Sequence, residues 1–209
     1  MADESVPTPV GAALISWFRP AEAARVVMVL GHGTATGVEA GDLQAIAATL
    51  PSAGVAVALV TQPYRLNRGR GRDEPSLDLA WKSVWPRAAE SGVPIIAGGR
   101  SAGSQVACRT AKDLGAVAVL ALAYPLLGPG SPRELLATGL PTLIVQGTND
   151  PFGQPAQFPQ LPPSFEMVEV PLGNHMFGVP AGAATDAPPP LAIVASAVSR
   201  WVETLLLSL

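Results

Sequence analysis

The sequence is poor in the residues that bind metals, form disulfides or create strong surface charge. Its 209 residues include one cysteine and two histidines, and only 14% are Asp, Glu, Lys or Arg. The single thiol, Cys108, excludes an internal disulfide, and two histidines are too few to complete a zinc cluster with it. The formal net charge of -3 gives no reason to expect nucleic acid or an acidic membrane as a partner. We therefore expect no metal site and no nucleic-acid partner.

Long hydrophobic runs are also absent from the sequence. No stretch of about 18 or more apolar residues could span a bilayer, and Met1 to Ser5 lack the charged-then-apolar order of a signal peptide. We expect a soluble, cytoplasmic protein with no membrane partner. An apolar fraction of 48% over 209 residues suits one α/β domain, residues 1–209, without a separate lid domain. Nothing in the sequence predicts an oligomeric state.

What the sequence does contain is a series of short apolar runs. Five are near-continuous Val, Ile, Leu and Ala, as in strands of a parallel sheet that is covered on both faces. They are Val26 to Leu30, Val55 to Val60, Pro94 to Ala97, Val117 to Ala123 and Thr142 to Val145. Val10 to Phe18 and Phe165 to Val170 are expected as two outer strands, and the second alternates like a half-exposed edge.

Helical stretches separate these strands wherever parallel neighbours need a crossover. They are Ala40 to Leu50, Leu77 to Ser91, Ala102 to Leu114 and Leu191 to Leu207. The alternation predicts an α/β fold: a doubly wound, mostly parallel sheet of about seven strands with helices on both faces. Trp81, Trp85 and Trp201 are spaced for the apolar faces of these helices, so we expect them in the core, whereas the environment of Trp17 is left open.

The pentapeptide Gly99-Arg100-Ser101-Ala102-Gly103 has the G-x-S-x-G pattern of a nucleophile elbow. A strand must turn sharply into a helix there, and glycine lets the neighbouring backbones approach while the serine hydroxyl stays accessible. The pattern alone is weak evidence, but here it has a predicted strand before it and a predicted helix after it. Ser101 is therefore the candidate nucleophile.

Polar residues follow the predicted strands at the edge where open α/β sheets bind ligands. Ser101 follows the central strand, Asp150 follows Thr142 to Val145, and His175 follows Phe165 to Val170. A serine hydroxyl needs a base to take its proton and a carboxylate to orient that base. The chain order Ser, Asp, His is that of nucleophile-elbow hydrolases. This order favours catalytic roles over the alternatives, which are a turn aspartate before proline for Asp150 and a surface histidine for His175.

Several motifs together resemble the α/β-hydrolase superfamily. They are Leu30-Gly-His-Gly33, Gly98 to Gly103, Ala123-Tyr-Pro-Leu126, Pro141 to Gly153 and Asn174-His175. The resemblance spans about Val26 to Leu209. Within the superfamily, the sequence is similar to the small lidless, dienelactone-hydrolase-like members, including the group of testis-expressed protein thirty. Ser104 departs from this group, which commonly has a third glycine there, and the change bears on the packing of the elbow helix.

The resemblance implies that Ser101 is the nucleophile, His175 the general base and then acid, and Asp150 its ionised partner. It also implies no metal or organic cofactor.

An oxyanion hole is implied as well. Its donors would be the backbone N–H of Ala102 and a second N–H from the loop after Val26 to Leu30, that of Thr34 or, as the alternative, Gly33. We expect His32, in the same loop, to tether it through hydrogen bonds rather than to take part in the reaction.

Arginines are concentrated in one loop after Val55 to Val60. They are Arg65, Arg68, Arg70 and Arg72. A solvated loop is the default interpretation of such a charge cluster. The alternative is a guanidinium lip for an anionic acyl or phosphate-bearing substrate, with Tyr64 beside Arg65 as a wall of the pocket. Arg100 is expected to tie the elbow to neighbouring loops.

Two functions are compatible with these residues. The first is a serine hydrolase that cleaves a small-molecule ester or thioester through an acyl-enzyme, with amide hydrolysis open because the same triad serves it. Only Gly128 to Leu140 could form a lid, so we expect an open site that accepts small acyl groups. The alternative is a non-catalytic binding or scaffold protein, since a fold does not determine its function.

Overall fold

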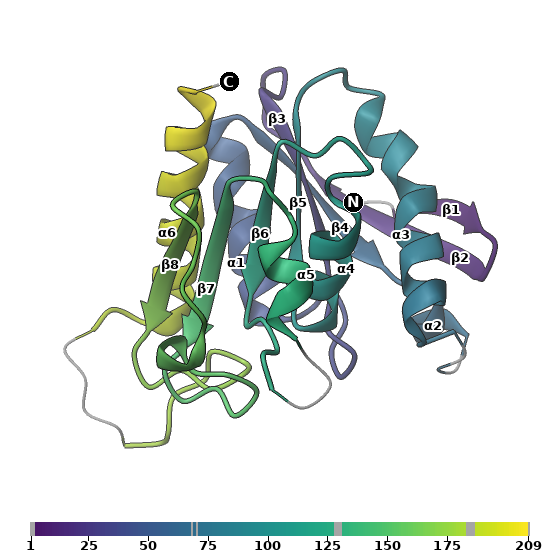
Figure 1. Ribbon diagram of the computed structural model, residues 1–209. Coiled ribbons are helices and arrows are strands. Elements are labelled where there is room, and N and C mark those ends of the chain that lie inside the picture. Colours follow the sequence, from purple (N-terminus) through teal and green to yellow (C-terminus); the bar gives the residue numbers. More distant parts are fainter. Residues whose placement is uncertain (1–2, 68, 70, 128–130, 183–186, 209) are drawn as a thin grey trace.

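The computed structural model describes residues 3–67, 69, 71–127, 131–182 and 187–208. In these ranges eight strands form one sheet in the order β1-β2-β4-β3-β5-β6-β7-β8 (Figure 1). The strands are β1 (Glu4–Thr8), β2 (Gly11–Phe18), β3 (Val26–Gly31), β4 (Val55–Thr61), β5 (Ile95–Arg100), β6 (Ala118–Leu122), β7 (Thr142–Gly147) and β8 (Phe165–Val170). The helices are α1 (Gly41–Thr49), α2 (Pro63–Leu66), α3 (Glu74–Ala89), α4 (Ala102–Thr110), α5 (Pro132–Leu136) and α6 (Pro190–Leu206). The predicted fold class is confirmed.

The sheet has one more strand than the sequence predicts. Strands β3 to β8 run parallel to one another, whereas β2 pairs antiparallel with β4 and β1 pairs antiparallel with β2. The predicted strand Val10 to Phe18 is therefore the second arm of a hairpin. Its first arm, β1, is short and contains Pro7, which pairs with Ala12 at the outer edge of the sheet. Proline obscures a strand in the sequence, but an edge strand tolerates it because one side of its backbone has no partner.

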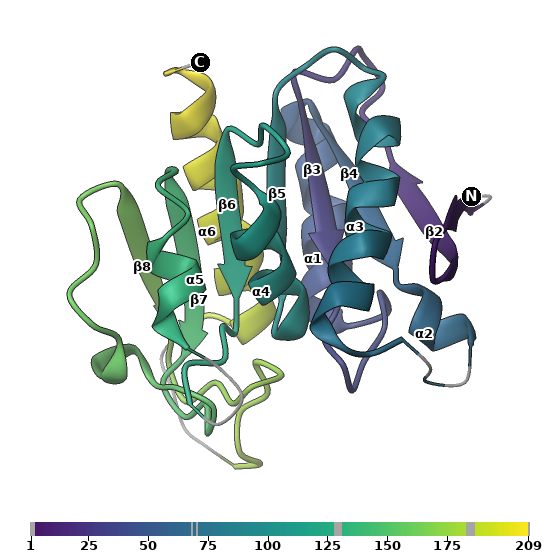
Figure 2. The same cartoon turned by 45° about the vertical axis from the view of Figure 1, so that its right-hand side comes forward.

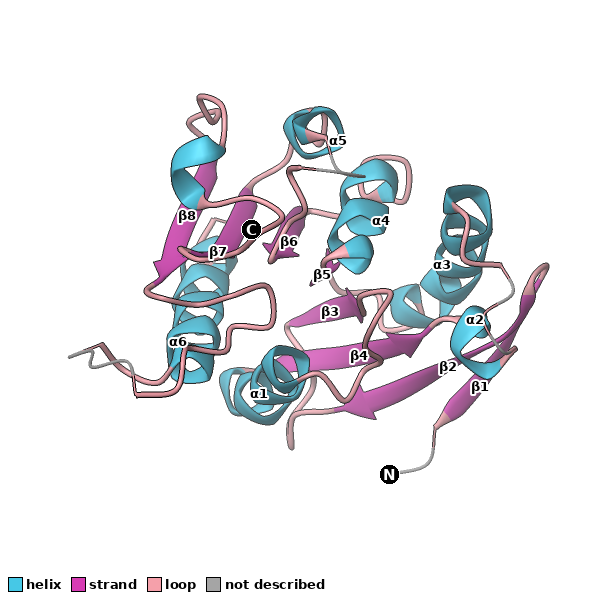
Figure 3. Cartoon of the chain, turned by 90° about the horizontal axis from the view of Figure 1, so that it is seen from below, coloured by secondary structure: helices cyan, strands magenta, loops and turns pink. Residues whose placement is uncertain are grey.

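Helices cover both faces of the sheet, as Figure 2 and the view from below in Figure 3 show. Helices α3, α4 and α5 pack on one face, and α1 and α6 pack on the other. The alternation of side chains along β3 supplies both layers, since Val27 and Val29 join the first core while Val26 and Leu30 join the second. This two-sided burial explains why the central strands are continuously apolar in the sequence.

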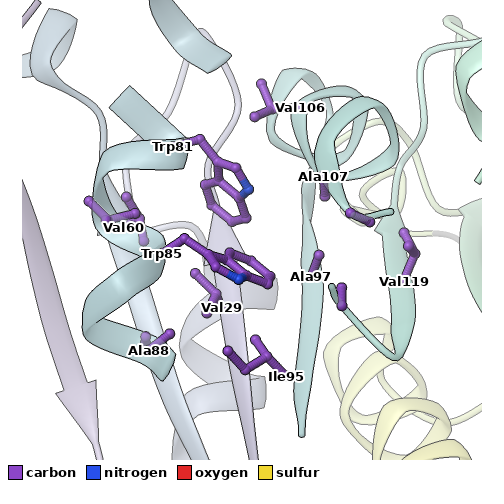
Figure 4. Packing of buried hydrophobic residues seen from close by; sticks show 14 of the residues in the cluster. Val29, Val60, Trp81, Trp85, Ala88, Ile95, Ala97, Val106, Ala107 and Val119 are labelled. Carbon is purple, nitrogen blue, oxygen red and sulfur yellow. The ribbon is translucent and has the colours of Figure 1, made fainter. Parts of the chain in front are cut away.

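The tryptophans predicted to lie in the core are buried. Trp81 and Trp85 extend from α3 over β3 and β5 and lie opposite Val106 and Ala107 of α4 (Figure 4). Their ring centroids are 6.2 Å apart, and Trp201 is buried on α6 in the opposite layer. Trp17, which the sequence left open, donates its indole N–H to Glu4 Oε2 and so ties β2 to β1.

The helix boundaries shift by a few residues from the predicted ones where local capping decides them. Helix α3 begins three residues before the predicted start at Leu77, because the Asp73 side chain accepts a hydrogen bond from the Ser76 N–H at 3.0 Å. The short helices α2 and α5 were not predicted, since four or five residues carry no helical periodicity. Within the described ranges, no helix is long and apolar enough to cross a membrane. The cytoplasmic location stays a prediction.

Candidate active site

The turn from β5 into α4 holds Ser101 in a strained conformation. Ser101 has φ 51° and ψ −122°, a region that L-residues rarely adopt. A Cβ on Gly99 would lie 2.6 Å from the carbonyl carbon of Gly103, and one on Gly103 would lie 2.5 Å from that of Gly31. The helix after the serine therefore packs directly on the backbones of β3 and β5. This close approach is why the pattern needs both glycines.

A continuous hydrogen-bonded chain joins the three polar residues that follow β5, β7 and β8. His175 Nε2 lies 2.9 Å from Ser101 Oγ, and His175 Nδ1 lies 2.8 Å from Asp150 Oδ2. A carboxylate can only accept, so Nδ1 carries a proton and Nε2 is free to accept the serine proton. The Asp150 side chain is fully buried, whereas that of His175 is 17% exposed. The structure thus brings together Ser101, His175 and Asp150, 74 and 25 residues apart along the chain.

Gln146 holds the Asp150 carboxylate, a contact that sequence reasoning missed. Its Nε2 donates to Asp150 Oδ2 at 3.0 Å and to the Gly153 carbonyl at 2.6 Å, while its Oε1 accepts from the Tyr124 N–H. The Phe152 N–H donates to the second carboxylate oxygen at 2.9 Å. The signal in the sequence is Gln146, an amide that follows the apolar run Leu143 to Val145 within strand β7. A buried amide needs partners, so its position points to a polar network.

The loop after β8 presents the imidazole through a turn built by Asn174. Asn174 Oδ1 accepts from the N–H groups of Met176 and Gly178, at 2.8 and 3.0 Å. The Phe152 ring packs against the His175 ring, with 4.6 Å between the two ring centroids and an interplanar angle of 59°. The imidazole is therefore held by its hydrogen bonds, by its backbone turn and by an aromatic neighbour.

The two residues whose backbone amides are the expected oxyanion donors, Ala102 and Thr34, both line the cleft beside Ser101. Ala102 is the first residue of α4, where a helix leaves its N–H groups without intrahelical partners. Thr34 lies in the loop after β3 and lines the same cleft. Within the described part of the chain, neither amide donates to a protein acceptor. Gly33, the alternative donor, is not among the residues that line the cleft, although a Cβ on it would lie 3.3 Å from Ser101 Cβ.

His32 supports this loop from behind, in the tethering role expected of it. Its Nε2 accepts the Gln62 N–H at 3.0 Å, and its Nδ1 lies 2.8 Å from the Gly33 carbonyl oxygen. Tyr64 adds a hydrogen bond from its hydroxyl to the same carbonyl at 2.9 Å. Burial lowers the pKa of His32, because the charged imidazolium loses its hydration there.

A cleft of about 300 Å³ opens in front of Ser101. Its lining includes the apolar residues Pro125, Phe152 and Met176 and the polar residues Arg72, Glu74 and Gln105. The remaining lining residues are Thr34, Ala35, Leu77, Arg100, Ser101, Ala102 and His175. Phe152 and Met176 are 40% and 44% exposed, so their side chains form part of the mouth of the cleft.

Tyr64 and Arg65 do not line this cleft, so the alternative interpretation, in which they form a wall of the substrate pocket, is wrong for these two residues. Tyr64 is only 2% exposed because its ring packs beneath the loop after β3. Arg65 points to the surface and lies 3.5 Å from Glu39. Arg72 does reach the cleft and also lies over the Tyr64 ring, with 5.3 Å between its Cζ and the ring centroid. The other two arginines of the cluster, Arg68 and Arg70, lie outside the described residues.

Metal ligands do not gather at the cleft. Over the described ranges, no three His, Cys, Asp or Glu side chains are placed to hold a metal ion together. Cys108 lies on α4, but it is buried among apolar side chains and burial raises its pKa. Cys108 is therefore not exposed to the cleft, whereas Ser101 lines it.

Comparison by sequence identifies a domain that covers most of the chain. A family model described as an alpha/beta hydrolase domain matches residues 24–203. A search of the curated proteins finds no match.

Comparison by structure finds the same architecture in solved enzymes. An α/β serine hydrolase without a lid from Xanthomonas campestris has a TM-score of 0.80 and 16% identity, covering 98% of this chain and 94% of that chain. Est1E from Butyrivibrio proteoclasticus has a TM-score of 0.77 and 14% identity over 100% of both chains. Dienelactone hydrolase from Anabaena variabilis has a TM-score of 0.73 and 20% identity, covering 97% and 96%. At these identities the likeness concerns the fold.

Proposed function

Because the chain belongs to the α/β-hydrolase family, we propose that it is a serine hydrolase that cleaves an ester or thioester through an acyl-enzyme. The observation that carries this proposal is the chain of hydrogen bonds from Asp150 through His175 to Ser101, which ends on a serine at the mouth of a cleft. Such a chain activates a hydroxyl that is otherwise a weak nucleophile near neutral pH.

Acylation follows from the placement of these groups. His175 Nε2 takes the proton of Ser101 as the serine oxygen attacks the carbonyl carbon of the substrate. The negative charge that develops on the carbonyl oxygen is stabilised by the N–H groups of Ala102 and Thr34, the two proposed oxyanion donors. The intermediate collapses when His175 gives its proton to the leaving alkoxide or thiolate. The acyl group then remains on Ser101 as an ester.

Deacylation repeats the same steps with water as the nucleophile. His175 takes a proton from the water, the hydroxide attacks the acyl carbon, and the proton returns to Ser101 as the acid leaves. Asp150 keeps the imidazole in the useful tautomer in both halves and stabilises the imidazolium that forms. Each half-reaction thus returns His175 to its neutral state.

The cleft favours a small acyl group. A volume of about 300 Å³ lies at the lower end of the range for small-molecule pockets, and Phe152 and Met176 offer an apolar surface next to the histidine. Ferulic acid is recorded as bound to Est1E. For this chain we propose short or aromatic acyl groups rather than long lipid chains.

The scaffold alternative fits the conformation of Ser101 poorly. A non-glycine residue held in a sparsely populated region costs of order 1–3 kcal/mol and persists where function needs it. A protein that only binds a partner has no physical need for this strain or for a buried carboxylate aimed at a histidine. The hydrolase is therefore the better explanation.

Replacement of the nucleophile tests the proposal directly. We expect wild-type protein to react covalently with a fluorophosphonate probe and to hydrolyse nitrophenyl acetate. Ser101→Ala should lose labelling completely and activity by at least about 10³-fold, because no acyl-enzyme can form. Ser52→Ala, an exposed serine near the end of α1, should keep both activities. Labelling that survives in folded Ser101→Ala, or a wild-type protein that never labels, would overturn the proposal.

A further inference from the structure

Arg100, the residue before Ser101, has its guanidinium buried under the cleft. Its side chain is 2% exposed, as is that of Asp42, and its Nε donates to Asp42 Oδ2 at 2.9 Å. The remaining nitrogens point to other segments: Nη1 donates to Thr36 Oγ1 at 3.2 Å, and Nη2 donates to the His175 carbonyl oxygen at 2.5 Å. The sequence-based expectation that Arg100 ties the elbow to neighbouring loops is confirmed.

Besides a contact of Nη2 with Met176 Sδ at 3.2 Å, the guanidinium has three oxygen acceptors, and these belong to three different segments. Thr36 lies two residues after Thr34, the proposed oxyanion donor, and the His175 carbonyl belongs to the proposed base itself. Asp42 lies in the first turn of α1, and its other oxygen accepts the Leu43 N–H at 3.0 Å. One planar group thus spans the oxyanion loop and the histidine loop and is fixed to a helix behind them.

We propose that Arg100 is a positioning residue that couples the oxyanion loop to the His175 loop, an inference that rests on the proposed hydrolase function. Among the described residues, the Arg100 side chain donates no hydrogen bond to Ser101 Oγ or to the imidazole nitrogens. It acts through the backbone of His175 and through the loop that carries Thr34.

The fork geometry of arginine is what allows the coupling. Its nitrogens diverge in one plane, so separate N–H groups reach acceptors in three directions at once. A lysine keeps the positive charge near Asp42, but its single nitrogen cannot span the same set of acceptors. Arg100→Lys therefore keeps the positive charge but removes the set of hydrogen bonds that joins the two loops.

Asp42 cancels the charge of Arg100 in the interior. Removal of either partner alone leaves a buried charge without compensation, which destabilises a fold strongly. Replacement of both by apolar residues of similar size is often neutral for stability. The double variant Arg100→Met with Asp42→Leu therefore removes the coupling and keeps the core filled.

The test measures kcat, KM and the rate of fluorophosphonate labelling in purified protein, beside its unfolding transition. We expect wild-type KM within about threefold and kcat lowered about 10- to 100-fold in Arg100→Lys and in the double variant, because a misplacement of about 1 Å costs rate on this scale. Thr36→Val, which releases only the oxyanion loop, should lower kcat by less. Val198→Ala, a buried change on α6, should lower stability without lowering kcat.

The outcomes separate positioning from simple structural support. If the folded double variant and Arg100→Lys both keep wild-type kcat and labelling rate, the pair only stabilises the fold and the inference is overturned. A kcat that falls in proportion to lost stability, as judged against Val198→Ala, would overturn it equally. A wild-type protein with no labelling would instead refute the hydrolase proposal, and this inference with it.

Discussion

Substitution of Asp150 by Asn probes the proposed catalytic chain while it keeps the size and shape of the side chain. In the folded protein both carboxylate oxygens accept: Oδ2 from His175 Nδ1 and Gln146 Nε2, and Oδ1 from the Phe152 N–H. An asparagine has one oxygen and one NH₂ group, so one of these sites must become a donor. Neither orientation of the amide satisfies all of its neighbours.

The more damaging orientation places the NH₂ group toward His175. The imidazole can then satisfy Nδ1 only as an acceptor, so its proton moves to Nε2, which can no longer accept from Ser101. The opposite orientation sets the NH₂ group against the Phe152 N–H, where two donors meet. We expect kcat to fall about 10⁴-fold, equivalent to about 5 kcal/mol of transition-state stabilisation. An unmatched buried donor should cost about 1–3 kcal/mol of stability in addition.

The assay is hydrolysis of nitrophenyl acetate, with urea unfolding followed in parallel. Asp113→Asn, at an exposed position after α4, is the matched control and should keep wild-type kcat. A folded Asp150→Asn protein with kcat within tenfold of wild type would refute the reasoning, since no third group near His175 would then be needed to orient it.

Two further predictions concern the buried histidine and the apolar mouth of the cleft. Burial lowers the pKa of His32 below its ordinary 6.5, so the stability from its neutral form is present above pH 6.5 and is lost as the pH falls toward the folded pKa. His32→Gln cannot titrate and should lose less free energy of unfolding between pH 7.5 and 5.5 in urea titrations; equal losses would contradict this assignment. Activity should fall with nitrophenyl esters longer than about four carbons, and Phe152→Ala should shift this preference; a flat profile in wild type would contradict the small acyl site.

Most of the fold could be predicted because buried parallel strands have a distinctive composition. Central strands such as β3 and β6 are apolar on both faces, and this pattern needs no knowledge of their neighbours. Strand β1 could not be found in this way. It is short, contains a proline and depends on its hairpin partner β2, so only the pairing shows it as a strand.

For the candidate site, too, some residues could be placed from the sequence and others could not. Ser101, Asp150 and His175 could be proposed from the sequence because each follows its own strand, and parallel strands end at one edge of a sheet. Tyr64 shows the limit of this argument. It follows β4 at the same edge, yet its ring turns inward beneath the Gly33 loop, because a tyrosine can satisfy its hydroxyl there as well as in a pocket.

The sequence by itself determined the local features: which runs form strands, where the chain can turn at Ser101, and which residue types are available for acid-base chemistry. These depend on neighbours a few positions away. Only the tertiary structure decided that Gln146 holds the aspartate and that Arg100 bridges Thr36, in the loop after β3, and the His175 carbonyl, in the loop after β8. Such contacts join residues as far as 75 positions apart. Side-chain direction and loop path decide them, and neither leaves a periodic trace in the sequence.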